Sequence, residues 1–147
     1  MYVSTKTYGH EIGLSCAFRQ WRAESHCRLI HGYALKIHLE FETDELDERN
    51  WVVDFGSLKS FKGMLEDTFD HKLLVAEDDP MKTEILRLQE LGLADVVVLP
   101  KAGCEAFAEY VFGAAETWLE SNGYAPRVRM RKVEVHEHGA NSAHFVR

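Results

Sequence analysis

The sequence predicts an α+β domain in which two long helices cover one face of an antiparallel β-sheet. Residues 33–42 alternate between apolar and polar side chains, which is typical of a half-buried strand. Residues 57–71 and 107–122 instead repeat their apolar side chains at helical spacing. The chain has 147 residues, and this length suits a single domain that spans 1–147.

The first strands are predicted from alternation and from turn residues. Segment 2–18 is expected to be a strand that Gly9 and Gly13 interrupt. After the alternating strand, the charged stretch 43–50 is typical of a hairpin loop. Residues 51–55 are then expected to form the returning strand.

The expected helices carry signals at their ends. Ser57 has the type of side chain that caps a helix, and the helix after it should end near 70–71. An aspartate followed by a proline at 79–80 predicts a shorter helix that ends near 91–92. The pair Asn-Gly at 122–123 ends the last helix.

Two further strands are expected, at 95–99 and at 127–136. The apolar side chains of the second strand change face along it, from Val128 and Met130 to Val133 and Val135. Either a bulge shifts the phase of this strand or the strand is covered on both sides. The sheet face without helices needs another cover, for which a homo-oligomer is the economical source.

Composition excludes several classes of function. Seventeen Lys and Arg against 24 Asp and Glu give a net charge of −7, which argues against nucleic-acid binding. No apolar run is long enough to span a bilayer, and the first residues lack the pattern of a signal peptide. An odd number of cysteines without a signal peptide predicts reduced thiols in a cytoplasmic protein. The three cysteines are Cys16, Cys27 and Cys104.

The densest group of reactive residue types lies at 25–33, just before and within the alternating strand. Nearby cations favour the thiolate of a cysteine, and His26, Arg28 and His31 surround Cys27 in the sequence. Cys27 is therefore a candidate nucleophile or base. The alternative is a free cysteine beside a loop, and local sequence alone favours that interpretation.

A carboxylate and an imidazole are adjacent at Asp70 and His71, near the predicted end of a helix. A neighbouring carboxylate fixes the tautomer of an imidazole and raises its basicity, as general acid–base catalysis requires. The alternative is a structural histidine that complements the dipole at the helix C-terminus.

The last predicted strand ends in His136, Glu137 and His138. On a regular strand the two histidines share a face and could ligate a metal ion, while Glu137 points the other way. A carboxylate there could bind a guanidine-like group through two parallel hydrogen bonds. The alternative is exposed polar alternation, and periodicity alone favours it.

Together these features resemble the family of 6-pyruvoyl- and 6-carboxytetrahydropterin synthases, over nearly the whole chain. The motifs that carry the resemblance are Cys27 with His31-Gly32, Val53-Asp54-Phe55, Asp70-His71, Gly103-Cys104-Glu105 and Val135-His136-Glu137. The resemblance implies a tunnelling fold (T-fold), with trimers that close their sheets into a β-barrel and usually pair into hexamers. It also implies active sites that lie between subunits.

The resemblance further implies roles for single residues. Glu137 anchors the amino-pyrimidinone edge of a pterin, and Cys27 moves protons on the side chain of 7,8-dihydroneopterin triphosphate. Asp70 and His71 assist that transfer. For Glu105 two roles stay open in this interpretation: support of the ring or orientation of the neighbouring backbone. The products are 6-carboxytetrahydropterin, acetaldehyde and triphosphate, on the route to 7-deazaguanines such as the queuosine precursor.

The triphosphate calls for arginine forks, and three arginines lie in or near the same loop. They are Arg19, Arg22 and Arg28. The alternative is that their charges are simply solvated.

The family holds a zinc ion with three histidines, and this sequence departs from that pattern. The matching positions are Phe18, His31 and Tyr33, so only His31 is a retained ligand. Three explanations stay open: a site rebuilt from other groups, a metal-free enzyme for another pterin, or a pterin or purine binder without turnover. The groups that could rebuild the site are Cys16, Tyr33, His26 and His10.

Overall fold

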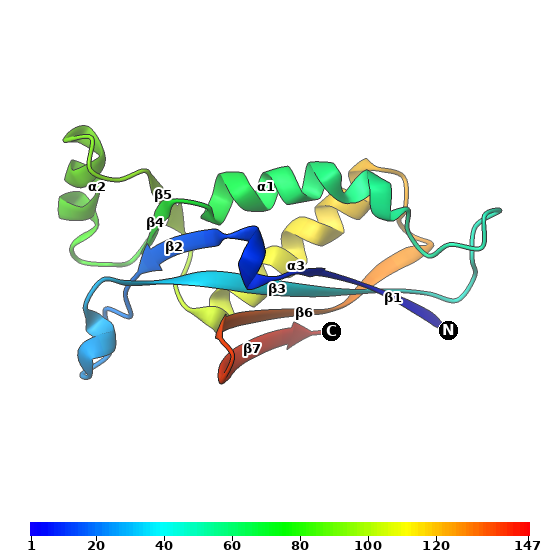
Figure 1. Ribbon diagram of the computed structural model, residues 1–147, viewed down its shortest axis with the longest axis horizontal. Coiled ribbons are helices and arrows are strands. Elements are labelled where there is room, and N and C mark those ends of the chain that lie inside the picture. Colours follow the sequence, from blue (N-terminus) through cyan, green and yellow to red (C-terminus); the bar gives the residue numbers. More distant parts are fainter.

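The computed structural model describes residues 1–147 as one mixed sheet with three α-helices (Figure 1). The strands are β1 (Tyr2–Tyr8), β2 (Leu14–Phe18), β3 (His31–Thr43), β4 (Lys72–Ala76), β5 (Val96–Leu99), β6 (Val128–His138) and β7 (Asn141–Val146). The helices are α1 (Lys59–Phe69), α2 (Lys82–Glu90) and α3 (Cys104–Ser121). The predicted α+β class is confirmed. None of the helices is long and apolar enough to cross a membrane.

The long strand β3 organises the sheet, whose order is β5-β4-β2-β3-β6-β7. β2 pairs with the first part of β3 and β1 with the second part, so the predicted interruption of the N-terminal strand is confirmed. Gly13 allows the break because its φ of 76° is a conformation that side chains disfavour. The β2–β4 and β4–β5 pairs are parallel, so the prediction of an antiparallel sheet holds only for the larger part.

A β-bulge in β6 explains why its apolar side chains seemed to change face. Met130 pairs with Phe41 and Lys132 pairs with Glu40, which leaves Arg131 as the extra residue. The bulge turns all four apolar side chains of the strand toward the helices, where each is at most 4% exposed. These are Val128, Met130, Val133 and Val135. The bulge interpretation is therefore confirmed.

Helices α1 and α3 lie along one side of the sheet, while α2 lies at one end of the molecule (Figure 1). Their buried faces follow the predicted helical spacing, with Phe61, Leu65 and Phe69 on α1 and Phe107, Val111 and Phe112 on α3. They pack on the alternating side chains of β3 in one core of 27 buried residues. Tyr110 shares the helical spacing of these apolar side chains but is 37% exposed.

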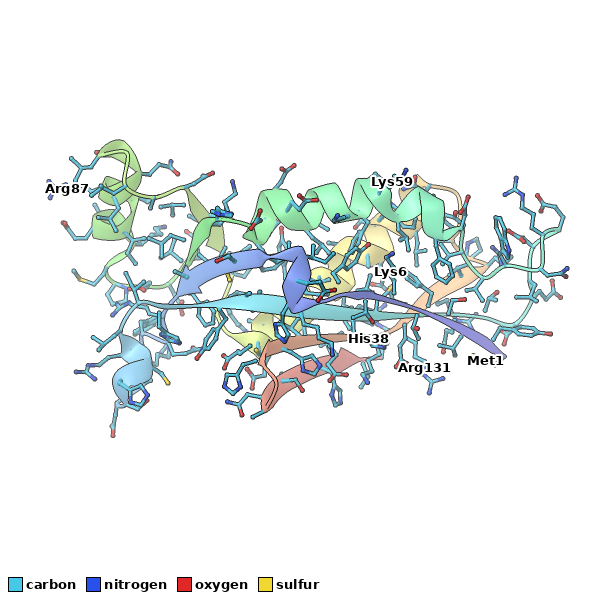
Figure 2. All side chains as sticks on the ribbon, in the orientation of Figure 1. Met1, Lys6, His38, Lys59, Arg87 and Arg131 are labelled. Carbon is cyan, nitrogen blue, oxygen red and sulfur yellow. The ribbon has the colours of Figure 1, made fainter.

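The sheet face opposite α1 and α3 carries charged side chains on β3 and β6. The carboxylate of Glu40 lies there 3.7 Å from His38 Nε2 and 3.3 Å from Arg131 Nε. His38 and Arg131 are labelled in Figure 2. Glu134 lies between Lys132 and the ring of His136 on the same face. The polar half of the predicted alternation is thus a network of opposite charges.

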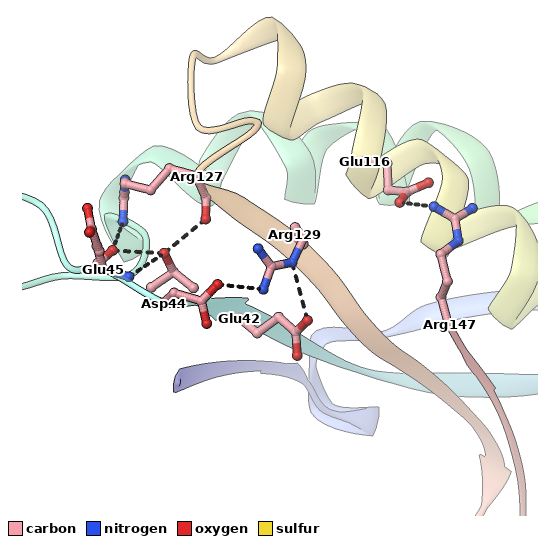
Figure 3. A network of polar contacts seen from close by, with 8 residues as sticks. Glu42, Asp44, Glu45, Glu116, Arg127, Arg129 and Arg147 are labelled. Carbon is pink, nitrogen blue, oxygen red and sulfur yellow. Dashed lines mark hydrogen bonds and ion pairs between the residues drawn. The ribbon is translucent and has the colours of Figure 1, made fainter.

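The returning strand predicted at 51–55 is wrong, because these residues form a turn and enter a 3-10 helix, Phe55–Leu58. Arg127 donates a hydrogen bond to the Glu45 carbonyl oxygen at 3.0 Å (Figure 3). It holds the turn by a second bond, to the Val52 carbonyl oxygen at 2.8 Å. The predicted cap at Ser57 is wrong as well. Asp54 caps the 3-10 helix by accepting from the Gly56 N–H at 2.8 Å.

Two strands were not predicted. β4 follows α1 after a turn at His71, whose φ of 57° reverses the chain within two residues. Its buried run of apolar residues has no alternation that would identify a strand. β7 pairs with β6 at the edge of the sheet, and exposed or half-buried side chains on both faces hide its pattern.

Candidate active site

Cys27 lies in a short 3-10 helix, His26–Arg28, that precedes β3. Ser25 caps this helix, because its Oγ accepts a hydrogen bond from the Cys27 N–H at 3.4 Å. The cysteine is half-buried, so its thiol is within reach of a small molecule. Six residues later Tyr33 points to the helix side of the sheet, the same side as Leu35 and Ile37.

Glu137 lies at the end of β6, close to the N-terminus of α3. Cys104 is the first residue of α3, and burial raises the pKa of its thiol to about 12. The negative charges of Glu137 and Glu105 raise that pKa further. Sequence reasoning missed the contact between Cys104 and Glu137, because it joins the start of a helix to the end of a distant strand.

Tyr33 is the place where these groups meet. Burial raises the pKa of its phenol, and the negative charge of Glu137 raises that pKa further. The phenol therefore keeps its proton at neutral pH and can donate a hydrogen bond. The structure thus brings the predicted anchor, Glu137, and the predicted base, Cys27, to one half-buried tyrosine.

Tyr33 belongs to a cluster of four rings. The ring centroids of Phe18 and His31 are 5.3 Å apart, those of His31 and Tyr33 are 5.4 Å apart, and those of Phe18 and Tyr33 are 6.0 Å apart. His138 adds a fourth ring, 6.0 Å from Tyr33. Phe18 also meets Phe107 of α3 edge to face, at 5.1 Å, so it is fixed in the core.

The predicted shared face of His136 and His138 is wrong. The Nε2 atom of His136 lies 2.7 Å from Glu134 on the charged face, while His138 lies beside Tyr33. A register shift between the two histidines in the β6–β7 pairing separates them. They therefore do not form a pair of metal ligands.

The residues at the family's zinc position do not fit a zinc ion. Phe18 has no lone pair, and a catalytic zinc ion normally takes three protein ligands. His31 donates its Nδ1–H to the Leu29 carbonyl oxygen at 2.7 Å, which leaves only Nε2 as a ligand atom. Burial and the charge of Asp70 raise the pKa of Cys16 to about 12, which disfavours a thiolate ligand.

No group of three or more His, Cys, Asp or Glu side chains is placed to hold a metal ion. His10, another candidate for a rebuilt site, instead turns its Nδ1 to the Ala34 carbonyl oxygen. Of the candidates for a rebuilt zinc site, Cys16 lies opposite Tyr33 in the β2–β3 register, but His10 is bonded elsewhere and no three such ligands come together.

Asp70 and His71 form the expected pair, with 2.9 Å between Asp70 Oδ1 and His71 Nδ1. Asp70 Oδ1 also accepts a hydrogen bond from the Ser15 N–H at 3.2 Å. The His71 side chain is 84% exposed and lines a shallow pocket with Ser15 and Ala17. Those two residues alternate with Cys16 and Phe18 along β2, so the pocket opens on the opposite side of the sheet from Tyr33.

The three candidate arginines differ in their partners. Arg19 Nη2 lies 2.7 Å from Oδ1 of Asp79, and the Asp79 side chain is only 2% exposed. Arg22 pairs with exposed Asp78 at 3.3 Å. Arg28 has no carboxylate partner and donates only to the Ser25 carbonyl oxygen, at 3.1 Å. Of the three, Arg28 is the one whose charge is free for a ligand.

Comparison with known proteins agrees with this fold. The family model described as 6-pyruvoyl tetrahydropterin synthase matches residues 9–147. A 6-carboxy-5,6,7,8-tetrahydropterin synthase of Aquifex aeolicus is 26% identical over 138 residues, which cover 90% of this chain and 83% of that protein. A protein of Pyrococcus abyssi that carries the same name provisionally is 32% identical over 132 residues, covering 84% and 78%.

Solved structures give the same result for the fold. An uncharacterized protein of Wolinella succinogenes superposes with a TM-score of 0.82 at 20% identity, covering 99% of this chain and 97% of that one. A 6-pyruvoyltetrahydropterin synthase of Plasmodium vivax superposes with a TM-score of 0.70 at 15% identity, covering 100% and 99%. The fold is that of the pterin synthases, the tunnelling fold. The chain belongs to the 6-pyruvoyl tetrahydropterin synthase family.

Proposed function

We propose that this chain is a pterin side-chain lyase of the 6-carboxytetrahydropterin synthase type. It converts 7,8-dihydroneopterin triphosphate to 6-carboxytetrahydropterin, acetaldehyde and triphosphate, in the cytoplasm and on the route to 7-deazaguanines such as the queuosine precursor. One observation carries the proposal: Cys27, just before β3, and Glu137, near the end of β6, both lie near the half-buried Tyr33. The proposed anchor for the pterin ring, Glu137, and the proposed base for the pterin side chain, Cys27, therefore lie near the same tyrosine.

Each group has a defined task in this proposal. The carboxylate of Glu137 accepts two parallel hydrogen bonds from the amino-pyrimidinone edge of the pterin. The nearby N-terminus of α3 favours the negative charge of Glu137 and Glu105. The thiolate of Cys27 accepts a proton from a carbon of the substrate's side chain. Arg28 binds the triphosphate through its free guanidinium, and Arg19 serves mainly to position the loop through Asp79.

The proposal includes a homo-oligomer, a trimer or a hexamer, as a part of the site. Within one chain the side chains of Asp70 and His71 bond to each other and to the Ser15 N–H, and neither bonds to Cys27, although all three belong to the proposed proton transfer. The exposed His71 is available to a second copy of the chain. In the assembled protein one copy supplies the cysteine and its neighbour supplies the Asp-His pair.

The direct test incubates the purified protein with 7,8-dihydroneopterin triphosphate and follows acetaldehyde, with and without added divalent metal ions. We expect release of acetaldehyde, its loss in Cys27→Ala, and loss of substrate binding in Glu137→Gln. Glu109→Gln, an exposed carboxylate on α3, is the matched control and should behave as wild type. Absence of turnover under every metal condition would exclude the lyase, and glycolaldehyde in place of acetaldehyde would indicate an aldolase.

A second candidate is a pterin- or purine-binding protein without turnover. The observation that favours it is the replacement of two zinc-ligand positions by Phe18 and Tyr33. This candidate predicts that ligand binding survives Cys27→Ala, is lost in Glu137→Ala, and never releases an aldehyde. Binding that survives both substitutions would count against both candidates.

A further inference from the structure

Three rings on β2 and β3 form a triangle at the position where relatives hold zinc. The sides of the triangle, between ring centroids, are 5.3 Å for Phe18 and His31, 5.4 Å for His31 and Tyr33, and 6.0 Å for Phe18 and Tyr33. Three imidazoles bound to one tetrahedral zinc ion place their ring centres roughly 5 Å apart, given zinc–nitrogen bonds of about 2 Å. The strands therefore hold three rings at the spacing of a metal site, although two of the rings are not imidazoles.

The strand pairing fixes this triangle. Phe18 lies directly opposite His31 in the β2–β3 register, and Cys16 lies opposite Tyr33. Phe18 is only 1% exposed and is held edge to face by Phe107, so it cannot move aside for a donor group. The space that a zinc ion would need is closed on this side by a carbon ring.

The remaining two rings offer complementary polar atoms. His31 uses its Nδ1–H for the Leu29 carbonyl oxygen, so its Nε2 presents a free lone pair. Tyr33 presents a hydroxyl that can donate, and its ring is perpendicular to the His31 ring, with 5.4 Å between their centroids. One hydroxyl group of a ligand can accept a hydrogen bond from Tyr33 and donate one to His31 at the same time.

We propose that this triangle is a metal-free subsite in which the Tyr33 hydroxyl and the His31 Nε2 atom hold a side-chain hydroxyl of the substrate. The ring of Phe18 forms the apolar third side of this subsite. The identity of the substrate as a polyhydroxylated pterin rests on the proposed function. The metal-free character of the subsite rests only on the donor atoms of these residues.

The first test measures zinc directly and does not depend on activity. Wild-type protein, the double variant Phe18→His with Tyr33→His, and each single variant are loaded with zinc, dialysed and analysed for metal. We expect the double variant to retain one zinc ion per chain and the wild type to retain none in stoichiometric amount, because only the double variant offers three imidazoles. Tyr2→His with Phe55→His, two exposed aromatic residues, is the matched control.

Two results of this test would overturn the proposal. The first is stoichiometric zinc in the wild-type protein. The second is a correctly folded double variant, checked by circular dichroism and gel filtration, that retains no more zinc than the wild type. If the double variant does not fold, the wild-type measurement alone still decides whether the position holds a metal ion.

The second test removes the Tyr33 hydroxyl with Tyr33→Phe, and Tyr110→Phe on the exposed side of α3 is its control. We expect Tyr33→Phe to weaken binding of 7,8-dihydroneopterin about fivefold to tenfold, as the loss of one hydrogen bond predicts. A 7,8-dihydropterin without side-chain hydroxyls should bind wild-type protein and Tyr33→Phe with equal affinity. Equal affinity of wild type and Tyr33→Phe for 7,8-dihydroneopterin would overturn the assignment of Tyr33.

The two tests separate this inference from the proposed function. Catalysis by wild-type protein that continues in the presence of a strong chelator supports both, and catalysis that a chelator abolishes overturns the metal-free subsite only. If no aldehyde is released under any condition, the lyase is excluded, while the zinc and binding measurements still decide the subsite.

Discussion

Arg19 donates two hydrogen bonds to the carboxylate of Asp79, from Nε at 2.8 Å and from Nη2 at 2.7 Å. The same carboxylate accepts from the Met81 N–H at 2.8 Å, just before α2 begins. One buried carboxylate therefore joins the chain after β2 to the start of α2. This pair holds the loop that carries Cys27 and Arg28, since Arg19 also donates to the Arg28 carbonyl oxygen at 3.3 Å.

Removing this carboxylate should destabilise the fold. Asp79→Ala leaves the half-buried Arg19 without its partner and the Met81 N–H without its acceptor, so we expect a loss of about 3 kcal/mol in the free energy of unfolding. Chemical denaturation measures this loss. Asp78→Ala removes the neighbouring exposed pair, whose side chain is 56% exposed, and should cost under about 1 kcal/mol. Equal losses in both variants would contradict a structural role for the Arg19–Asp79 pair.

The same pair makes stability depend on pH. The hydrogen bond and charge of Arg19 lower the pKa of Asp79 in the folded protein. A carboxyl whose folded pKa lies below its unfolded value of about 4 stabilises the fold above that pH, and the stabilisation is lost as the pH falls through the folded pKa. The difference in unfolding free energy between wild type and Asp79→Asn should therefore be constant from about pH 7 to pH 5 and shrink in stronger acid. A difference that grows in acid would contradict this sign.

Regular patterns made most of the fold predictable. The alternation of β3 and the helical spacing of α1 and α3 are local properties of the sequence, and the structure keeps them. β4 was not predictable in this way because a fully buried strand has no alternation, and the turn before it depends on the left-handed backbone of His71. The turn at 51–55 depends on Arg127, which lies more than 70 residues away in the sequence.

The candidate site was predictable only as separate motifs. Cys27 and Glu137 stand out by residue type, but their shared neighbour Tyr33 follows from the pairing of β3 with β6. The bulge at Arg131 sets that pairing, and the sequence leaves two explanations for the change of phase. The partner of Arg19 lies 60 residues away and has no local signal.

Deleting Arg131 should disrupt the sheet more than replacing it. Without the extra residue, side chains beyond the bulge change face, so either Val133 and Val135 or Val128 and Met130 leave the core. We expect a loss of at least several kcal/mol, observed as failure to fold or a large fall in the melting temperature. Arg131→Ala keeps the bulge and removes only an exposed contact to Glu40, so it should cost under about 1 kcal/mol. A deletion variant as stable as Arg131→Ala would contradict the role of the bulge.

The three thiols should differ in their reaction with iodoacetamide at neutral pH. Cys16 and Cys104 are 5% and 6% exposed, and the pKa of each is raised to about 12, so they present almost no accessible thiolate. Cys27 is half-buried at the start of the site. We expect Cys27 to be carboxymethylated first, as peptide mapping by mass spectrometry would show, and Cys27→Ala to remove the fast phase of labelling.

A change at Glu137 tests the contact with Cys104 by the same method. Because the charge of Glu137 helps to raise the pKa of Cys104, Glu137→Gln should lower that pKa and bring the onset of Cys104 labelling to a lower pH. Burial is the larger cause and remains, so Cys104 should still react more slowly than Cys27. Glu109→Gln, on the exposed side of the same helix, should leave the labelling profile unchanged. An unchanged profile in Glu137→Gln would show that the carboxylate does not act on the thiol, and would weaken the assignment of Glu137 to this end of the site.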